Sequence, residues 1–174
     1  KSVQWYRKAA DQGEVFAQRM LGVIYTREGV AHDYVKAAQW YHKAADQGDL
    51  QAQSLLGALY AHGDGVAQDL EKAVQWYRKA GGQGDKNGQF FLGNMYTYGL
   101  GGVSQNYKKA VEWYRKAADQ GEAYAQHALG NMYTQGLGVA QDSKKAIQWY
   151  RKAAAQGNDL AMIKLSEIDA DGVE

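Results

Sequence analysis

The residues of this chain that could perform chemistry are its histidines, which are potential zinc ligands or general bases. They are spread along the sequence as His32, His42, His62 and His127. No two of them have the i, i+4 spacing that places two ligands on one face of a helix. The spacing therefore favours histidines that are solvated or hydrogen-bonded at the surface. The nearest approach to a metal pair is His62 with Asp64.

Two other stretches are similar to ligand-binding loops. The segment 169–172 starts like a calcium loop, Asp-x-Asp-Gly, but the remaining ligands would lie beyond Glu174. The segment 99–102, Gly-Leu-Gly-Gly, follows an expected helix, whereas a phosphate-binding loop follows a strand and continues into Gly-Lys-Ser/Thr. We interpret both as parts of repeat loops. We predict no catalytic, metal-binding or cofactor-binding residues.

Charge and composition argue against nucleic-acid binding, membrane insertion and thiol chemistry. The chain has 20 Lys+Arg, 19 Asp+Glu and no cysteine, so it has no bulk attraction for phosphates and forms no disulfide. No apolar run approaches the roughly 20 residues of a membrane helix. Runs such as 76–79, Trp-Tyr-Arg-Lys, mix aromatic and basic residues as single-strand binders do. Their regular placement favours core aromatics beside a solvated charged face.

The elements that position these residues come from one motif, which recurs along the whole chain. Trp-Tyr followed by Lys-Ala and then Gln-Gly occurs in segments 1–13, 36–48, 72–84, 109–121 and 145–157. The tryptophans of these segments are Trp5, Trp40, Trp76, Trp113 and Trp149. By subtraction, neighbouring tryptophans are 35 to 37 residues apart. Self-similarity at such a period is the mark of a stacked repeat array.

Each repeat is predicted to form two helices, A and B. In the repeat 49–84, the apolar stripe of helix A consists of Ala52, Leu55, Leu56, Leu59 and Tyr60. The stripe of helix B consists of Ala73, Trp76, Tyr77 and Ala80. We expect Gly63 and Gly65 to end helix A, Asp69 to cap helix B, and Gly84 to close it with a left-handed turn.

Spacing separates the packed joints from the loops. The step from the helix B alanine to the tyrosine of the next helix A is constant, as from Ala37 to Tyr60, whereas the step from that tyrosine to the following alanine varies. Packed joints reject insertions and surface loops accept them. We therefore expect a tight joint between helix B and the next helix A, and A–B loops along an exposed rim.

A glycine follows a leucine inside every complete helix A, at Gly22, Gly57, Gly93 and Gly130. A glycine within a helix costs about 1 kcal/mol relative to alanine. Its recurrence predicts a compensating close approach of the Trp-Tyr pair of helix B. We expect a large residue there to push the helices apart, and we expect all five tryptophans to be buried in the joints.

The repeat pattern is most complete in the fourth repeat. Its residues are Ala125, Leu129-Gly130, Tyr133, Gly136-Leu137-Gly138-Val139, Asp142, Lys145-Ala146, Trp149-Tyr150, Lys152-Ala153-Ala154 and Gln156-Gly157. This pattern resembles the Sel-one-like repeat (SLR) family, a branch of the tetratricopeptide-like helical solenoids, over essentially the whole chain. The resemblance implies an all-α, right-handed superhelical solenoid of antiparallel helix pairs that acts as an adaptor for other proteins. It also implies a bacterial protein of the periplasm or one that is secreted.

The expected organisation is a single solenoid over residues 1–174. It consists of a half-repeat 1–13, repeats 14–48, 49–84, 85–121 and 122–157, and a half-repeat 158–174. Three places depart from the pattern: Gly88 replaces an alanine, the first loop keeps only Gly29-Val30, and Gly81-Gly82 is expected to interrupt a helix B. Because the chain opens partway through a repeat at Lys1, we expect a piece of a longer protein.

The predicted binding surface is the side of each helix A that points away from its stripe, because A helices line the concave side of such arrays. The residues there are Phe16, Arg19, Val23, Arg27, Gln51, Ser54, Ala58, His62, Asn87, Phe90, Asn94, Tyr98, Tyr124, His127, Asn131 and Gln135. The partner-binding prediction includes all of them except Val23, Ser54 and Ala58. These positions differ between repeats, which fits a surface that recognises one partner and also fits an unconstrained surface.

Composition favours the binding interpretation. Phe90, Tyr98 and Tyr124 have no expected place in the interhelix core, and aromatic residues are enriched at binding hot spots. The carboxamides of Asn94 and Asn131 occupy equivalent places and could bond to an extended peptide, as in tetratricopeptide grooves. The absence of carboxylates and the presence of arginine and histidine on this surface favour an acceptor-rich or acidic partner segment.

The sequence therefore predicts a non-catalytic protein–protein interaction module without cofactors. Changing both Phe90 and Tyr124 to alanine is expected to weaken partner binding by about 2 kcal/mol. Two alternatives stay open: an immunity or inhibitor protein that neutralises one toxin, and a hydrolase. The hydrolase has less support because the chain lacks cysteine and a convergent nucleophile–base pair.

Overall fold

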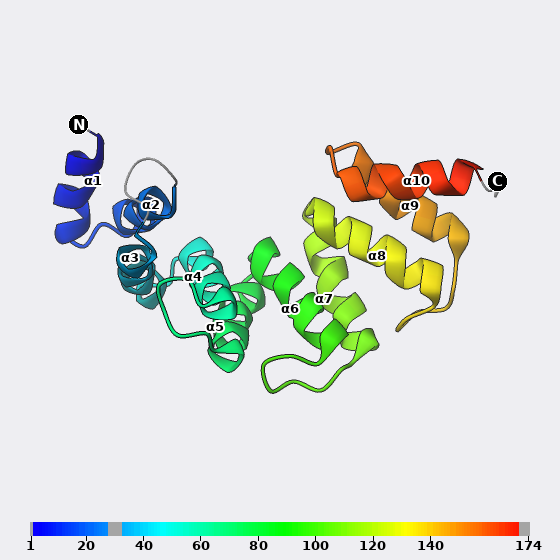
Figure 1. Cartoon of the computed structure of the whole chain (residues 1–174), viewed down its shortest axis with the longest axis horizontal. Helices are drawn as coiled ribbons and strands as arrows, with labels where there is room; N and C mark the ends of the chain where they lie inside the picture. Colours follow the sequence, from blue (N-terminus) through cyan, green and yellow to red (C-terminus); the bar gives the residue numbers. More distant parts are fainter. Residues whose placement is uncertain (1, 28–32, 171–174) are drawn as a thin grey trace. The chain divides into compact units, whose positions relative to one another are not determined.

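The computed structural model describes residues 2–27 and 33–170, whose regular structure is entirely helical (Figure 1). The helices are α1 (Ser2–Asp11), α2 (Val15–Thr26), α3 (Tyr34–Asp46), α4 (Leu50–His62), α5 (Leu70–Gly82), α6 (Lys86–Tyr98), α7 (Tyr107–Asp119), α8 (Ala123–Gln135), α9 (Ser143–Ala154) and α10 (Asp159–Ala170). They pack as consecutive antiparallel pairs of a helical solenoid, which confirms the predicted fold class. None of these described helices is long and apolar enough to cross a membrane.

Some predictions fall on residues outside those that the structure describes. These are His32, the Gly29-Val30 remnant of the first loop, and the second half of the calcium-like segment 169–172. Contacts divide the chain into two compact parts, the N-terminal half (Lys1–Gly88) and the C-terminal half (Gln89–Glu174). The division falls inside α6.

The helix ends follow the predicted signals. The Asp69 carboxylate accepts a hydrogen bond from the backbone N–H of Lys72 at 2.9 Å and so caps α5. Gly63 ends α4 with a φ of 82°, and Gly84 follows α5 with a φ of 103°. These left-handed conformations are accessible to glycine and strained for other residues, so glycine can end each helix where the repeat requires it.

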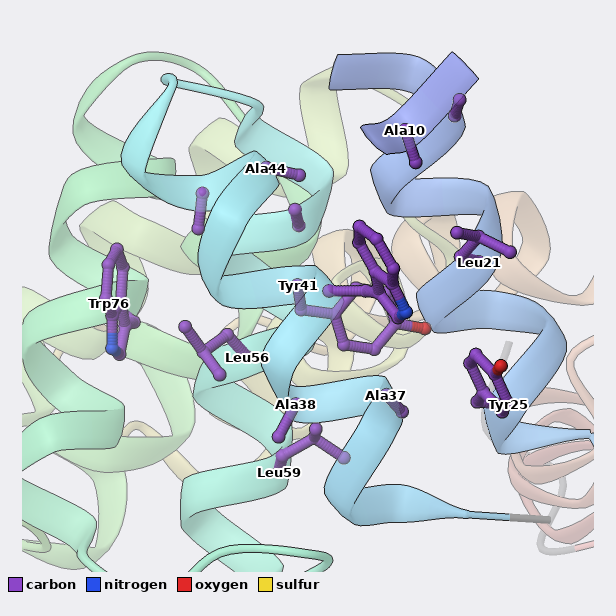
Figure 2. Close-up of a cluster of buried hydrophobic side chains, with 14 residues drawn as sticks. Ala10, Leu21, Tyr25, Ala37, Ala38, Tyr41, Ala44, Leu56, Leu59 and Trp76 are labelled. Carbon is purple, nitrogen blue, oxygen red and sulfur yellow. The ribbon is translucent and has the colours of Figure 1, made fainter. Parts of the chain in front are cut away.

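Within a repeat, the glycine of helix A lies directly against the tyrosine ring of helix B. A Cβ atom built on Gly22 would lie 2.3 Å from the Tyr41 ring, and one built on Gly130 would lie 2.3 Å from the Tyr150 ring. Figure 2 shows Tyr41 in the space between α3 and α2. Both tyrosines are fully buried. The predicted close approach is confirmed, and its partner residue is the tyrosine of the Trp-Tyr pair.

The tryptophans are less uniformly buried than predicted. Those of the later B helices are buried or half-buried: Trp40, Trp76, Trp113 and Trp149. Trp5, in contrast, is 73% exposed, so the prediction is wrong for this residue. Trp76 contacts the His42 ring of the preceding helix B, at 5.7 Å between ring centroids. No described helix precedes α1, so Trp5 has no such neighbour.

Two details of the predicted helices are also wrong. Leu55 was expected on the buried stripe of α4 but is exposed, because the helix buries the face that carries Leu56. Gly81-Gly82 does not interrupt α5, which continues to Gly82. A Cβ on Gly88 would lie 2.8 Å from the Gly81 nitrogen, so the two departures from the repeat pattern fit each other.

Buried glutamines join successive repeats, and the sequence analysis missed them. Gln53 Nε2 donates to the carbonyl of Ala45, near the end of the preceding helix B, at 3.1 Å. Gln18 donates in the same way to Ala10 at 3.2 Å. Each bond ties helix B to the next helix A, which explains why this connection has a constant length. The signal was present in the sequence, since a glutamine recurs at this place in each complete repeat.

Candidate functional site

The C-terminal half contains a pocket of about 430 Å³, which is within the size range of ligand sites in proteins. Residues of α6 and α8 form most of its lining, with contributions from the loops after these helices, from α7 and from α10. The lining residues are Phe90, Asn94, Thr97, Tyr98, Gln105, Tyr107, Tyr114, Tyr124, His127, Ala128, Asn131, Met132, Gln135, Leu137 and Leu160.

The pocket brings together the partner-binding residues that were predicted in this half. They are Phe90, Asn94, Tyr98, Tyr124, His127, Asn131 and Gln135. The remaining predicted residues do not line it: Phe16, Arg19, Arg27, Gln51, His62 and Asn87. Their role in binding stays a prediction.

Buried tyrosines orient the asparagines of the pocket. The Tyr114 hydroxyl donates to Asn94 Oδ1 at 2.7 Å and lies 3.0 Å from the Thr97 hydroxyl. Thr97 in turn bonds to the Gly93 carbonyl, at 2.8 Å. Burial raises the pKa of Tyr114 well above its usual range, so its hydroxyl keeps its proton. The carboxamide oxygen of Asn94 is thus held by the core, and its nitrogen is left to donate to a ligand.

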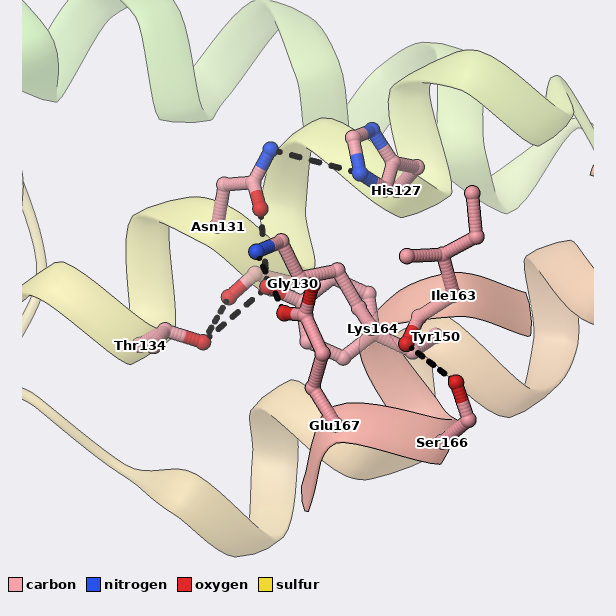
Figure 3. Close-up of polar contacts among 9 residues, drawn as sticks. All are labelled: His127, Gly130, Asn131, Thr134, Tyr150, Ile163, Lys164, Ser166 and Glu167. Atoms are coloured by element: carbon pink, nitrogen blue, oxygen red, sulfur yellow. Dashed lines mark hydrogen bonds and ion pairs between the residues drawn. The ribbon is translucent and has the colours of Figure 1, made fainter. Parts of the chain in front are cut away.

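The next repeat repeats this arrangement (Figure 3). The Tyr150 hydroxyl donates to Asn131 Oδ1 at 2.8 Å and lies 3.1 Å from the Thr134 hydroxyl. Thr134 bonds to the Gly130 carbonyl at 2.9 Å. The C-terminal half therefore carries two equivalent carboxamides, each fixed by the tyrosine that packs on the helix A glycine.

The histidine of the pocket is only partly exposed. The Asn131 carboxamide nitrogen lies 3.5 Å from His127 Nε2, and the His127 and Tyr150 rings are 5.8 Å apart. Burial, and to a smaller extent the charge of Lys164, lowers the pKa of His127 below its ordinary value. The neutral imidazole is therefore favoured near neutral pH.

Phe90 is less available than predicted. It is half-buried and packs against the buried cluster of α7 and α8, with its ring centroid 6.0 Å from that of Tyr114. The expectation that Phe90 has no place in the core is therefore wrong. Tyr98 and Tyr124, in contrast, are 68% and 57% exposed. Both line the pocket, so a ligand there can reach these two tyrosines directly.

Predicted residues in the N-terminal half are partly engaged within the chain. Arg19 Nε bonds to Asp49 at 3.1 Å, and the Arg19 guanidinium lies over the Phe16 ring at 5.1 Å. His62 Nδ1 is 2.8 Å from the Ala58 carbonyl oxygen. Arg27, Gln51 and Asn87 are exposed. The expectation of an acidic partner depended partly on Arg19, whose charge is already paired.

The basic–aromatic runs are also engaged internally. Lys79 Nζ lies 4.1 Å from the Trp76 ring centroid, and Lys116 Nζ lies 4.2 Å from that of Trp113. Such cation–π contacts keep each lysine side chain against the tryptophan ring of the same helix. Among the described residues, no group of three or more His, Cys, Asp or Glu side chains could hold a metal ion.

Several lining residues were missed by the sequence analysis. Thr97 and Tyr107 had no predicted role, and Tyr114 belongs to a Trp-Tyr pair that was assigned to the core. Leu160 comes from the last helix. One signal was available: both repeats of this half contain Gly-Asn-Met-Tyr-Thr, at 93–97 and 130–134, whereas the earlier repeats have apolar residues in place of the asparagine. The contribution of α10 has no such signal.

Comparisons with known proteins identify the repeats. The Sel1 repeat family model matches residues 1–14, 15–49, 50–85, 86–122 and 123–158. No curated protein gives a significant sequence match.

Several solved structures from bacteria have a similar fold. A protective antigen of uropathogenic Escherichia coli with an SLR fold is 43% identical, with a TM-score of 0.88 over 97% of this chain and 36% of the antigen. A Sel1 repeat protein from Oxalobacter formigenes is 37% identical, with a TM-score of 0.89 over 95% of this chain and 66% of that protein. The chain thus spans only part of the length of both.

A third similar structure is an immunity protein from Pseudomonas aeruginosa. It is 27% identical to this chain, with a TM-score of 0.62, and the match covers 91% of this chain and 58% of that protein.

Proposed function

The chain belongs to the Sel1 repeat family, and from this premise we propose that it is a non-catalytic protein-binding module. Its ligand is a peptide or protein segment that enters the pocket of the C-terminal half. The observation that carries the proposal is the presence of exposed tyrosines and oriented carboxamides around one pocket. Aromatic residues often supply most of the binding energy of an interface.

The chemistry of the pocket supports binding more than catalysis. Its lining consists of aromatic, aliphatic, hydroxyl and carboxamide side chains with a single histidine. The described lining residues include no carboxylate, lysine or arginine. Groups of this kind orient a ligand through hydrogen bonds and exclude water.

The similarity to an immunity protein supports a second candidate. In this alternative, the same repeat surface binds and neutralises one toxin, and its ligand is a folded protein instead of a flexible segment. Because the similar proteins are bacterial, we also propose that the chain acts in a bacterial periplasm or outside the cell.

The proposal is tested with a partner that is first captured on the immobilised chain, identified, and then measured by calorimetry. Changing both Tyr98 and Tyr124 to alanine should weaken binding by about 2 kcal/mol or more, without a change in circular dichroism. These tyrosines replace the predicted Phe90/Tyr124 pair, since Phe90 also supports the core.

The matched control is Trp5→Ala. Trp5 is an aromatic residue of α1 that lies outside the predicted binding surface and is 73% exposed. If an identified partner keeps its affinity after the double tyrosine change, or loses as much affinity with Trp5→Ala, the assignment of binding to the pocket is contradicted. If that partner is a toxin and the chain blocks its activity, the second candidate is favoured.

A further inference from the structure

The mouth of the pocket is apolar. Tyr98 and Tyr124 are joined there by Leu160 of α10, which is 51% exposed. Behind them, Phe90 lies between two rings, with centroid distances of 6.0 Å to Tyr114 and 6.1 Å to Tyr124. Exposed apolar side chains that converge on one cavity are stabilised by covering them with another apolar group. The pocket is therefore suited to an apolar side chain of the ligand.

The electrostatic surroundings of the pocket disfavour a charged ligand group of either sign. An anion would find no lysine or arginine among the described lining residues, and the nearby Lys164 is already paired with Glu167 at 2.8 Å. A cation would find no carboxylate among the described lining residues. Moving a charged group from water into a site where no opposite charge pairs with it has a large desolvation cost.

The polar groups that remain are suited to peptide backbone. Asn94 and Asn131 each use the carboxamide oxygen to accept from a buried tyrosine. Their nitrogens can donate to carbonyl oxygens of a ligand, since an amide nitrogen carries two protons. Among the described residues, the Asn131 nitrogen has a long contact of 3.5 Å with His127. Donors of this kind hold an extended segment whatever its side chains are.

We propose that the pocket binds an extended, uncharged peptide segment with an aromatic or bulky aliphatic anchor residue. The anchor enters between Tyr98, Tyr124 and Leu160, and the backbone carbonyls beside it accept hydrogen bonds from Asn94 and Asn131. This inference depends on the proposed function and names its ligand class. It replaces the acidic segment that the sequence suggested.

The inference is tested by selecting a random peptide library, displayed on phage, against the immobilised chain. The enriched peptides should share a Phe, Tyr, Trp or Leu anchor among uncharged residues. For a synthetic representative, Tyr124→Ala should reduce affinity by about tenfold or more, and Asn94→Ala by about fivefold. Replacing the anchor in the peptide with Asp or Lys should reduce binding at least as much as Tyr124→Ala does.

Two controls separate the inference from the function on which it depends. Trp5→Ala should leave the affinity unchanged, and circular dichroism should show that each variant stays folded. Peptides that require Tyr124 but carry an acidic or basic anchor would overturn the ligand class and leave the pocket as the binding site. Failure to enrich any peptide, or enrichment of peptides that bind the Tyr124→Ala variant equally well, would count against both.

Discussion

In the N-terminal half, the helix A position after the buried glutamine carries a polar side chain that bonds within the chain. Arg19 bonds to Asp49 at 3.1 Å, and the Ser54 hydroxyl donates to Asp85 at 2.5 Å. Both aspartates immediately precede the next helix A. These bonds engage polar groups that would otherwise be available to a ligand.

In the C-terminal half, the same position carries rings instead. Phe90 and His127 stand there and line the pocket. One turn further along, Asn94 and Asn131 stand where the N-terminal half has Val23 and Ala58. The packed stripe is therefore common to both halves, and the side chains beside it decide which residues line the pocket of the C-terminal half.

The largest expected effect on stability tests whether both halves share the contact between the helix A glycine and the helix B tyrosine. Gly22→Leu and Gly130→Leu should each lower the free energy of unfolding by about 3 kcal/mol, because a Cβ on either glycine overlaps a buried tyrosine ring. Chemical denaturation measures this loss. As a control, Gly82→Ala places its Cβ in open space within α5 and should stabilise the chain by about 0.5–1 kcal/mol. Tolerance of leucine in only one half would mean that the halves do not share this joint.

A smaller effect should distinguish the halves through the tyrosine hydroxyl. Tyr150→Phe keeps the ring against Gly130 but removes the hydrogen bond to Asn131, so it should cost about 1–1.5 kcal/mol of folding stability. Tyr41→Phe should cost less, because Val23 stands at the asparagine position of that repeat. Thermal denaturation of the two variants gives the comparison. Equal losses would indicate that the asparagine bond contributes nothing measurable.

The smallest effect is the pH dependence that His127 gives to the C-terminal half. Burial and Lys164 lower the pKa of His127 in the folded chain, so the unfolded chain binds a proton at higher pH. The stability from the neutral imidazole is thus complete above the unfolded pKa of about 6.5 and is lost as the pH falls toward the lower folded value. Between about pH 7 and pH 5, the unmodified chain should lose more stability than His127→Gln does.

An equal loss of stability in the unmodified chain and in the His127→Gln variant over this pH range would contradict the assignment of the effect to His127.

The helices and their ends could be predicted because their signals are local. Asp69 caps α5 through a residue three positions away, and Gly63 ends its helix through its own backbone conformation. The deeper member of each Trp-Tyr pair could not be predicted in this way. Tyr41 and Trp40 are neighbours with similar hydrophobicity, and only the packing of α2 on α3 directs the tyrosine toward Gly22.

The candidate site was predictable in part for the same reason. Helical spacing correctly grouped Asn94 with Tyr98 on one side of α6, and the equivalent residues on one side of α8. Spacing within a helix does not show that Phe90 packs onto the core, that Arg19 is paired with an aspartate, or that Leu160 reaches the pocket from α10. These contacts join residues that are distant in the sequence.

The sequence alone determined the repeat, its two helices and the family. The reason is that the same apolar stripe and the same turn signals occur in each repeat. Only the tertiary structure decided which residues close the joints and which residues line the pocket of the C-terminal half. The physical reason is that burial and hydrogen bonding between different helices depend on their relative placement, which no single repeat encodes by itself.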